Sequence, residues 1–120
     1  MEAPEDHATT VRGLCARLAF AFVYAFPASV SLSATAEGAT HTVVMEGVAF
    51  KPEALTVKPG DTVVWVNKDL FPHTVTAQDR SFDSREIAAD KSWKFAAKKS
   101  GTFPYVCTLH PTMKGTLVVR

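Results

Sequence analysis

Cysteine and histidine are scarce in this sequence, and its charges nearly cancel. The 120 residues include 2 Cys and 4 His, and 13 Lys and Arg stand against 12 Asp and Glu. There is no basic tract and no acidic tail, so the composition gives no indication of nucleic-acid binding or of a disordered partner arm. There is also no Met-rich or His-rich tract of the kind that sequesters metal ions.

The longest hydrophobic run is too short for a transmembrane helix. It extends from Leu18 to Val30, whereas a membrane-spanning helix needs about 20 apolar residues. Arg12 and Arg17 precede the run, and the small residues "ATA" at Ala34–Ala36 follow it. A basic flank, a short apolar core and a small-residue cleavage site are the layout of a secretory signal. We therefore expect export, to a bacterial periplasm or beyond; an uncleaved anchor is the alternative.

The predicted signal peptide covers residues 1–36. Its acidic beginning, "MEAPEDHATT", does not fit a signal, which should begin with basic residues. We expect translation to start near Val11 instead, because the valine codon GTG also serves as a start codon. Cleavage after Ala36 would remove Cys15 and leave a single domain over residues 37–120, with no membrane span.

This domain retains one cysteine, Cys107. In an exported protein it has no intramolecular partner, so it is a free thiol, an intermolecular link or a metal ligand. A zinc site with two cysteines is excluded by the count. Small domains often recruit a metal, which favours the third interpretation.

No segment shows a sustained helical period, and the domain reads as strands throughout. Segments rich in Val, Thr and aromatic residues alternate with turn signals about every eight to twelve residues, which predicts an all-β sandwich or barrel. "PG" at Pro59-Gly60 predicts a turn. The expected strands are 41–47, 55–57, 62–66, 72–77, 92–97, 101–107 and 115–120.

Five aromatic residues on these strands are expected to form the core: Phe50, Trp65, Trp93, Phe95 and Phe103. A relay role for a tryptophan in electron hopping is the alternative. Core packing is the better interpretation, because aromatic side chains supply much of the buried area in small domains.

The stretch "YVCTLHPTMKG" places Cys107, His110 and Met113 at three-residue intervals, and "LFPHTVT" supplies His73 upstream. Each residue alone has an ordinary explanation as core or surface. Together they offer two imidazoles, a thiolate and a thioether, the ligand set of a blue-copper electron-transfer site. A thioether is a poor zinc ligand, which favours copper.

The sequence resembles the cupredoxins of the plastocyanin and amicyanin group. The resemblance is carried by "FKPEALTVKPGDTVVWVNKDLFPHTVTA" and "GTFPYVCTLHPTMKGTLVV" and covers roughly Thr42 to Val119. The Cys-x-x-His-x-x-Met spacing is similar to amicyanin in particular. The resemblance implies a Greek-key β-sandwich of about seven or eight strands and one type 1 copper per chain. The implied ligands are His73, Cys107, His110 and Met113.

Thr74 is one departure from the resemblance, since many members have Asn after the first histidine ligand to tie the two ligand loops together. We expect Thr108 to replace this link. The resemblance also implies that the backbone N–H of Thr74 donates to the Cys107 sulfur.

The resemblance implies an exported, monomeric one-electron carrier. Its redox partners would dock transiently on an apolar collar around His110, although scattered surface apolarity is the alternative. The collar residues would be Leu70, Phe71, Pro72, Leu109 and Pro111. A copper storage, delivery or resistance protein is the competing function. A copper enzyme is rejected, because the domain keeps one spare histidine, His41, which we expect to be a solvated strand residue.

Overall fold

The computed structural model describes residues 21–33 and 38–120, which belong to two separate units. Residues 21–33 form no regular secondary structure. The predicted start near Val11 and the predicted cleavage after Ala36 lie outside the described residues, so the signal peptide stays a prediction. Within the described ranges, no helix is long and apolar enough to cross a membrane.

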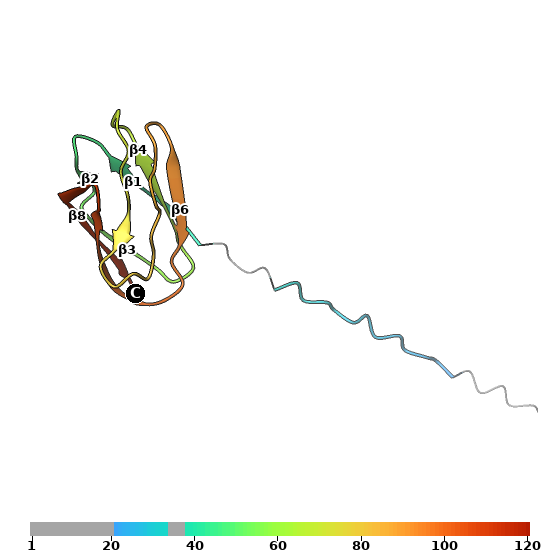
Figure 1. Ribbon diagram of the computed structural model, residues 1–120. Coiled ribbons are helices and arrows are strands. Elements are labelled where there is room, and N and C mark those ends of the chain that lie inside the picture. Colours follow the sequence, from blue (N-terminus) through green and yellow to red (C-terminus); the bar gives the residue numbers. More distant parts are fainter. Residues whose placement is uncertain (1–20, 34–37) are drawn as a thin grey trace, which may run out of the picture. The chain divides into compact units, whose positions relative to one another are not determined.

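The second unit is a sandwich of two four-stranded sheets (Figure 1). One sheet has the order β2-β1-β4-β6 and the other β3-β8-β7-β5. The strands are β1 (Thr40–Met45), β2 (Phe50–Lys51), β3 (Ala54–Val57), β4 (Thr62–Asn67), β5 (Thr76–Ala77), β6 (Ser92–Ala96), β7 (Gly101–Cys107) and β8 (His110–Val119). The expectation of an all-β sandwich with seven or eight strands is confirmed.

The chain crosses between the sheets, as a Greek key requires. β1 pairs with β4 in parallel and β3 pairs with β8 in parallel, whereas the remaining pairs are antiparallel. Parallel neighbours need a crossover connection, here through the opposite sheet. β1 and β4 therefore end at the same pole of the sandwich. The end of β7 lies beside the segment that follows β4, because the Thr74 N–H donates to Cys107 Sγ.

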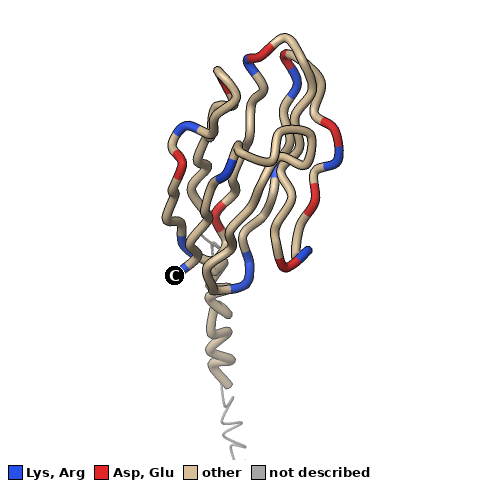
Figure 2. The backbone as a smooth tube through the Cα atoms, turned by 60° about the vertical axis from the view of Figure 1, so that its left-hand side comes forward, with Lys and Arg blue, Asp and Glu red and all other residues tan. Residues whose placement is uncertain are grey.

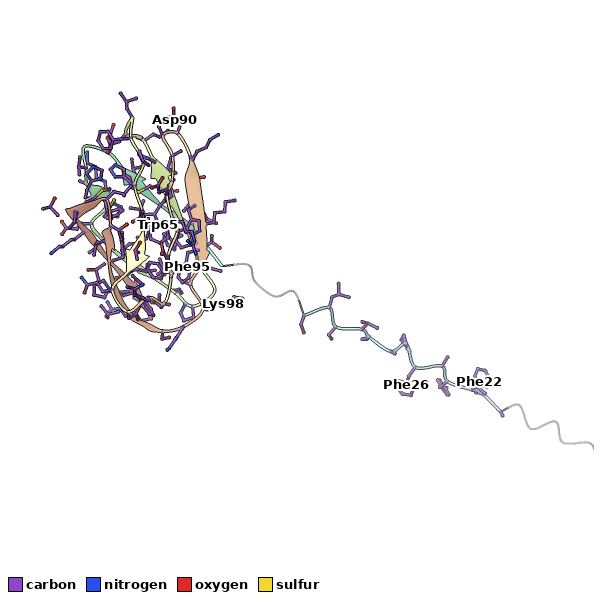
Figure 3. The ribbon with its side chains drawn as sticks, viewed as in Figure 1. Phe22, Phe26, Trp65, Asp90, Phe95 and Lys98 are labelled. Atoms are coloured by element: carbon purple, nitrogen blue, oxygen red, sulfur yellow. The ribbon has the colours of Figure 1, made fainter. Side chains whose placement is uncertain are left out.

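The core lies between the sheets and follows from strand alternation. On β4, Val63, Trp65 and Asn67 are buried while the residues between them are partly exposed. Figure 3 shows Trp65 in the interior. Phe50 and Phe103 are also buried, and Trp93 and Phe95 are half-buried against the same cluster, so the predicted aromatic core is confirmed.

Tyr105 of β7 adds an aromatic residue that the sequence did not single out. Its ring packs edge-on against Trp65, with the centroids 5.6 Å apart, and it is 1% exposed. Desolvation of the phenol in this core raises the pKa of Tyr105 to about 12. The hydroxyl therefore stays protonated at neutral pH.

The predicted turn at Pro59-Gly60 is present. The amide of Asp61 donates to the carbonyl of Lys58 at 3.0 Å, and Gly60 has φ of 94°. Proline before a residue with positive φ is the signature of a type II turn, in which glycine takes the left-handed position at no steric cost.

The strand expected over residues 72–77 is mostly absent, and only β5 remains of it. The two backbone N–H groups directly before β5, those of Thr74 and Val75, bind side chains instead of a neighbouring strand. Thr74 donates to Cys107 Sγ at 3.3 Å, and Val75 donates to Ser84 Oγ at 2.7 Å. The segment thus gives up regular pairing for contacts to Cys107 and to the 84–87 segment.

His41 lies on a strand, β1, as expected, but its side chain is only partly solvated. Its side chain is 29% exposed, and Nε2 donates to Asp61 Oδ2 at 2.9 Å. Asp61 is 6% exposed and also accepts hydrogen bonds from the amides of Ala39 and Lys58. The sequence does not reveal this hydrogen bond, because the carboxylate comes from a turn 20 residues away.

Candidate metal centre

The β7–β8 hairpin carries three of the four predicted ligands. Cys107 is the last residue of β7 and His110 the first of β8, and the two pair with each other across a two-residue connection. The next pair is Val106 with Lys114, so β8 holds three additional residues at this point. In a regular strand, residues three apart face opposite sides. The irregularity frees Met113, which is 1% exposed, from that alternation.

His73 reaches the hairpin from the segment between β4 and β5. Its backbone is fixed by an isolated bridge to Ile87, with its amide 3.1 Å from the Ile87 carbonyl and the return bond 2.7 Å long. The His73 side chain is fully buried. This bridge holds the ring at the end of the core, beside the hairpin.

Three potential ligand atoms converge at this pole. Cys107 Sγ lies 3.7 Å from Nδ1 of His73 and 3.7 Å from Nδ1 of His110. Within the described ranges these are the residues whose ligand atoms all lie within 4.8 Å of one another. Cys107 is fully buried, and His110 is half-buried.

Asp69 determines how the His73 ring is presented. Nε2 of His73 lies 2.7 Å from Oδ2 of Asp69. An ionised carboxylate only accepts hydrogen bonds, so Nε2 carries the proton and Nδ1 keeps its lone pair. That lone pair is on the side of Cys107. Burial alone would raise the pKa of Asp69, but hydrogen bonds from His73, Val48 and Gly47 outweigh it and hold the pKa below its usual value.

Asn67 holds the loop that carries these groups. It is fully buried at the end of β4, and its side-chain amide donates to the carbonyls of Phe71 and Ile87 at 2.9 and 3.0 Å. Its side-chain oxygen, Oδ1, accepts a hydrogen bond from the backbone N–H of Asp69 at 2.9 Å. The backbone N–H of Asp90 donates to the main-chain carbonyl of Asn67. Asp90 is labelled in Figure 3 and shows where this pole lies.

Sequence reasoning missed both Asn67 and Asp69. The available signal was a carboxylate four residues before a candidate ligand histidine, in "NKDLFPH". That signal is weak, because Asn and Asp after a strand are most often turn formers.

Thr74 links the two ligand segments, as expected. Its backbone N–H donates to Cys107 Sγ, and its hydroxyl accepts from the Thr108 amide at 2.8 Å. The two threonine hydroxyls are also 3.0 Å apart. The expectation that Thr108 replaces the usual asparagine link is confirmed.

An apolar surface surrounds the site. The Phe71 ring lies against both imidazoles, with its centroid 5.2 Å from that of His73 and 5.3 Å from that of His110. Leu70 is 92% exposed, Phe71 42% and Leu109 44%. Pro72 and Pro111 are exposed as well. All five residues predicted for the collar are therefore at the surface.

Charged residues are interspersed over the domain rather than gathered by sign. Figure 2 shows segments of Lys or Arg next to segments of Asp or Glu along the loops. The collar residues themselves are uncharged.

The donor set fits copper better than the other common metals. Two imidazole nitrogens, one thiolate and one thioether are soft or borderline ligands, whereas magnesium and calcium take oxygen ligands. The trigonal set of two histidines and one cysteine, with a methionine as a weak axial ligand, is that of blue-copper centres. A single cysteine within residues 37–120 also excludes a structural zinc site with two or more thiolates.

Comparisons with known proteins agree with this chemistry. Residues 14–119 match the family described as the cupredoxin-like domain. Amicyanin from Paracoccus denitrificans is 33% identical over 99 residues, which cover 77% of this chain and 76% of that protein. Amicyanin from Paracoccus versutus is 29% identical over 83 residues, or 65% of this chain and 63% of the relative, so this chain spans less than two thirds of its length.

Solved structures of copper proteins are also similar to this chain. A Cu(I) amicyanin variant aligns with a TM-score of 0.64 and 31% identity, over 71% of this chain and 85% of that chain. The Cu-containing nitrite reductase (NirK) from Thermus scotoductus also aligns with a TM-score of 0.64 and 29% identity, over 68% of this chain but 22% of the enzyme. This chain belongs to the cupredoxin-like family, and its cluster of His73, Cys107, His110 and Met113 fits one type 1 copper.

Proposed function

We propose that this protein is an exported one-electron carrier that binds one copper ion through His73, Cys107, His110 and Met113. The convergence of Cys107 Sγ with the two Nδ1 atoms at 3.7 Å carries the proposal. The names of the relatives, amicyanin and plastocyanin, support a carrier of this kind. Export is supported by the signal-like segment before the domain.

A copper ion held by these residues would supply a one-electron couple. The ligand set satisfies neither oxidation state fully, because Cu(I) prefers soft sulfur and Cu(II) prefers nitrogen in a tetragonal arrangement. The protein contributes rigidity. The bridge from His73 to Ile87, the Thr74–Thr108 link and the register of the hairpin fix three of the ligands on separate backbone segments. Restrained ligands move little, which keeps the cost of each electron transfer low.

Electrons would enter and leave through His110. This residue is half-buried, and the collar of Leu70, Phe71, Pro72, Leu109 and Pro111 lies at the same pole. An exposed apolar patch usually marks an interaction site. Partners in transient redox encounters bury less than about 1,200 Å² in total. We propose that partners dock here and dissociate rapidly, and that the protein is a monomer.

An enzymatic role is not proposed. A copper enzyme such as nitrite reductase needs a further histidine-bound copper, and the spare histidine of the domain, His41, is hydrogen-bonded to Asp61. The similar nitrite reductase aligns with this chain over 22% of its own length.

The first test is optical and EPR spectroscopy of the purified protein loaded with Cu(II), beside Cys107→Ser. Thiolate-to-copper charge transfer should give an intense blue colour that bleaches on reduction and is lost in the variant. A control, Ser92→Ala on the exposed start of β6, should keep the colour. A colourless protein, or one that takes up zinc in preference to copper, would contradict the proposed site.

A second measurement separates an electron carrier from a copper-delivery protein. A carrier should keep its copper through repeated cycles of reduction and oxidation in the presence of a Cu(I) chelator. Loss of copper to the chelator on the first reduction would instead support storage or delivery.

A further inference from the structure

The Asp69 carboxylate accepts three hydrogen bonds, and one of them comes from the proposed ligand His73. Its Oδ2 accepts from His73 Nε2 at 2.7 Å and from the amide of Val48 at 3.0 Å, while Oδ1 accepts from the amide of Gly47 at 2.8 Å. The Asp69 side chain is 12% exposed, and that of His73 is fully buried. One carboxylate therefore joins the β1–β2 turn to a proposed ligand.

We propose that Asp69 is a positioning residue for the centre. It holds His73 as the Nε2–H tautomer, so that Nδ1 is ready to bind, and its negative charge lowers the reduction potential. This inference rests on the proposed function, since it concerns the same copper site. Outer hydrogen bonds that fix the tautomer and orientation of a ligand histidine commonly change metal affinity or activity by about 10- to 100-fold.

The tautomer argument follows from the acceptor-only chemistry of a carboxylate. Neutral imidazole carries its proton on one of its two nitrogens, and the hydrogen bond made by one nitrogen decides the state of the other. Because Asp69 has no proton to donate, the Nδ1–H tautomer of His73 would leave two lone pairs facing each other across 2.7 Å. Of the two neutral tautomers of His73, only the Nε2–H form can donate a hydrogen bond to the Asp69 carboxylate.

The charge argument concerns the balance between oxidation states. A fixed negative charge stabilises the more positive of two metal states more strongly, and a poorly hydrated site screens that effect less than bulk water does. Asp69 is separated from the metal-binding atom by one imidazole ring. Its carboxylate should therefore favour Cu(II) over Cu(I) and lower the potential.

The turn explains why the carboxylate stays in place. Gly47 and Val48 have φ of 64° and 55°, and a β-branched residue in the left-handed region is a rare, strained conformation. In this conformation both backbone N–H groups donate to the Asp69 carboxylate, one to each oxygen. The turn thus fixes the carboxylate, and the carboxylate in turn stabilises the strained backbone.

The experiment compares Asp69→Asn with Asp69→Glu, and uses Glu46→Gln as a matched control. Glu46 is an exposed carboxylate of the same turn, paired with Lys51 at 3.8 Å, and does not contact His73. Its variant removes one negative charge from the β1–β2 turn and leaves the hydrogen bond to His73 intact.

The first readout is the ¹⁵N NMR signature of His73 in the metal-free protein. The parent protein, Glu46→Gln and Asp69→Glu should show the Nε2–H tautomer, and Asp69→Asn should show a mixture, because an amide can also donate. The second readout is the reduction potential of the copper-loaded protein. It should rise more in Asp69→Asn than in Glu46→Gln, with copper lost to a chelator about 10- to 100-fold faster.

Val48→Gly tests whether the effect is merely structural. It relieves the strain of the turn and keeps both amides, so the tautomer and the potential should be unchanged. An unaltered His73 tautomer in Asp69→Asn, or a potential shift no larger than that of Glu46→Gln, would overturn the inference. The metal-free readout needs no copper, so a protein that fails to bind copper would contradict the proposed function without deciding this result.

Discussion

Thr74 holds together the two segments that carry the proposed ligands, and it does so with two different groups. Its backbone N–H serves the Cys107 sulfur, whereas its hydroxyl serves the amide and hydroxyl of Thr108. The same hydroxyl lies 3.1 Å from that of Thr76, which is 3.1 Å from Asp83. A short hydrogen-bonded chain therefore runs from the hairpin to the surface.

Replacing Thr74 by Val should loosen the site without removing its colour. The shapes of the two side chains are similar, and the backbone N–H to Cys107 remains, but the backbone N–H of Thr108 loses its acceptor. Loss of an outer hydrogen bond that orients a ligand segment commonly weakens a metal site by about 10- to 100-fold. We expect copper to pass to a chelator at least about tenfold faster. Thr56→Val, on exposed β3, is the control; equal rates in the two variants would contradict the role of Thr74.

At this scale the sequence predicts residues whose chemistry is unusual, and it misses residues whose chemistry is common. Cysteine, histidine and methionine at fixed spacing stand out because few other functions need that set. Asp69 and Asn67 do not stand out, since the same residue types occur in most turns. Their roles depend on where the β1–β2 turn and Ile87 lie in space, which no local pattern contains.

At the scale of elements, the β7–β8 hairpin is built around the close pairing of Tyr105 with Gly115. A Cβ added at Gly115 would lie 2.4 Å from Cζ of Tyr105 and 2.5 Å from its hydroxyl. The ring cannot swing aside easily, because it packs edge-on against Phe50 at 4.7 Å as well as against Trp65. Gly115 thus allows Tyr105 to close the core next to the ligand strand.

Gly115→Ala should therefore destabilise the fold by about 1–3 kcal/mol, the usual cost of overpacking a core. Thermal or denaturant unfolding of the metal-free protein measures this directly. Lys114→Ala, on the adjacent exposed position of β8, provides the matched control and should change the free energy of unfolding by less than about 0.5 kcal/mol. If Gly115→Ala leaves the free energy of unfolding unchanged, the Tyr105 ring can move aside, which would contradict this argument.

Asp61, in the turn before β4, should make the stability of the fold depend on pH. The pKa of Asp61 is held below its usual value by hydrogen bonds from the Lys58 backbone and the His41 side chain. A carboxyl whose pKa is lowered by folding stabilises the folded state above its unfolded value, near 3.9, and loses that contribution as the pH falls through the lowered value. The melting temperature of Asp61→Asn should accordingly fall furthest below that of the parent near neutral pH.

The difference in melting temperature between the parent protein and Asp61→Asn should become smaller as the pH drops below about 4. Melting curves of the metal-free proteins across this range provide the measurement. Glu53→Gln, an exposed side chain, controls for the loss of one negative charge. A gap that stays constant with pH would mean that Asp61 acts by shape and not by charge.

The elements also show where sequence patterns stop being informative. Strands with clear alternation, such as β4 and β7, were predicted nearly to the residue. The segment before β5 was predicted as a longer strand, because "HTVTA" has the composition of one, but its amides bind Cys107 and Ser84. β8 begins at His110 rather than Gly115, since the additional residues opposite Val106 extend the hairpin through the ligand segment.

At the scale of the whole domain, the proposed redox centre lies at one pole, and charged residues of both signs are interspersed along the loops. The collar contributes three exposed apolar side chains at this pole, Leu70, Phe71 and Leu109. An encounter between two such proteins would bury apolar surface and involve little charge complementarity. Its rate should therefore depend only weakly on ionic strength, unlike that of electrostatically steered pairs.

Electron self-exchange between oxidised and reduced copies tests this surface without a known partner. Replacing both Leu70 and Leu109 by Ser removes apolar area from the encounter and touches no proposed ligand, so the colour and the potential should be unchanged. We expect self-exchange, measured by NMR line broadening, to slow by about tenfold, which corresponds to ~1.4 kcal/mol of lost contact energy. Serines at exposed Ala54 and Ala96 are the control. If both double variants exchange electrons at the parental rate, docking does not use the collar, and His110 is not the point of entry.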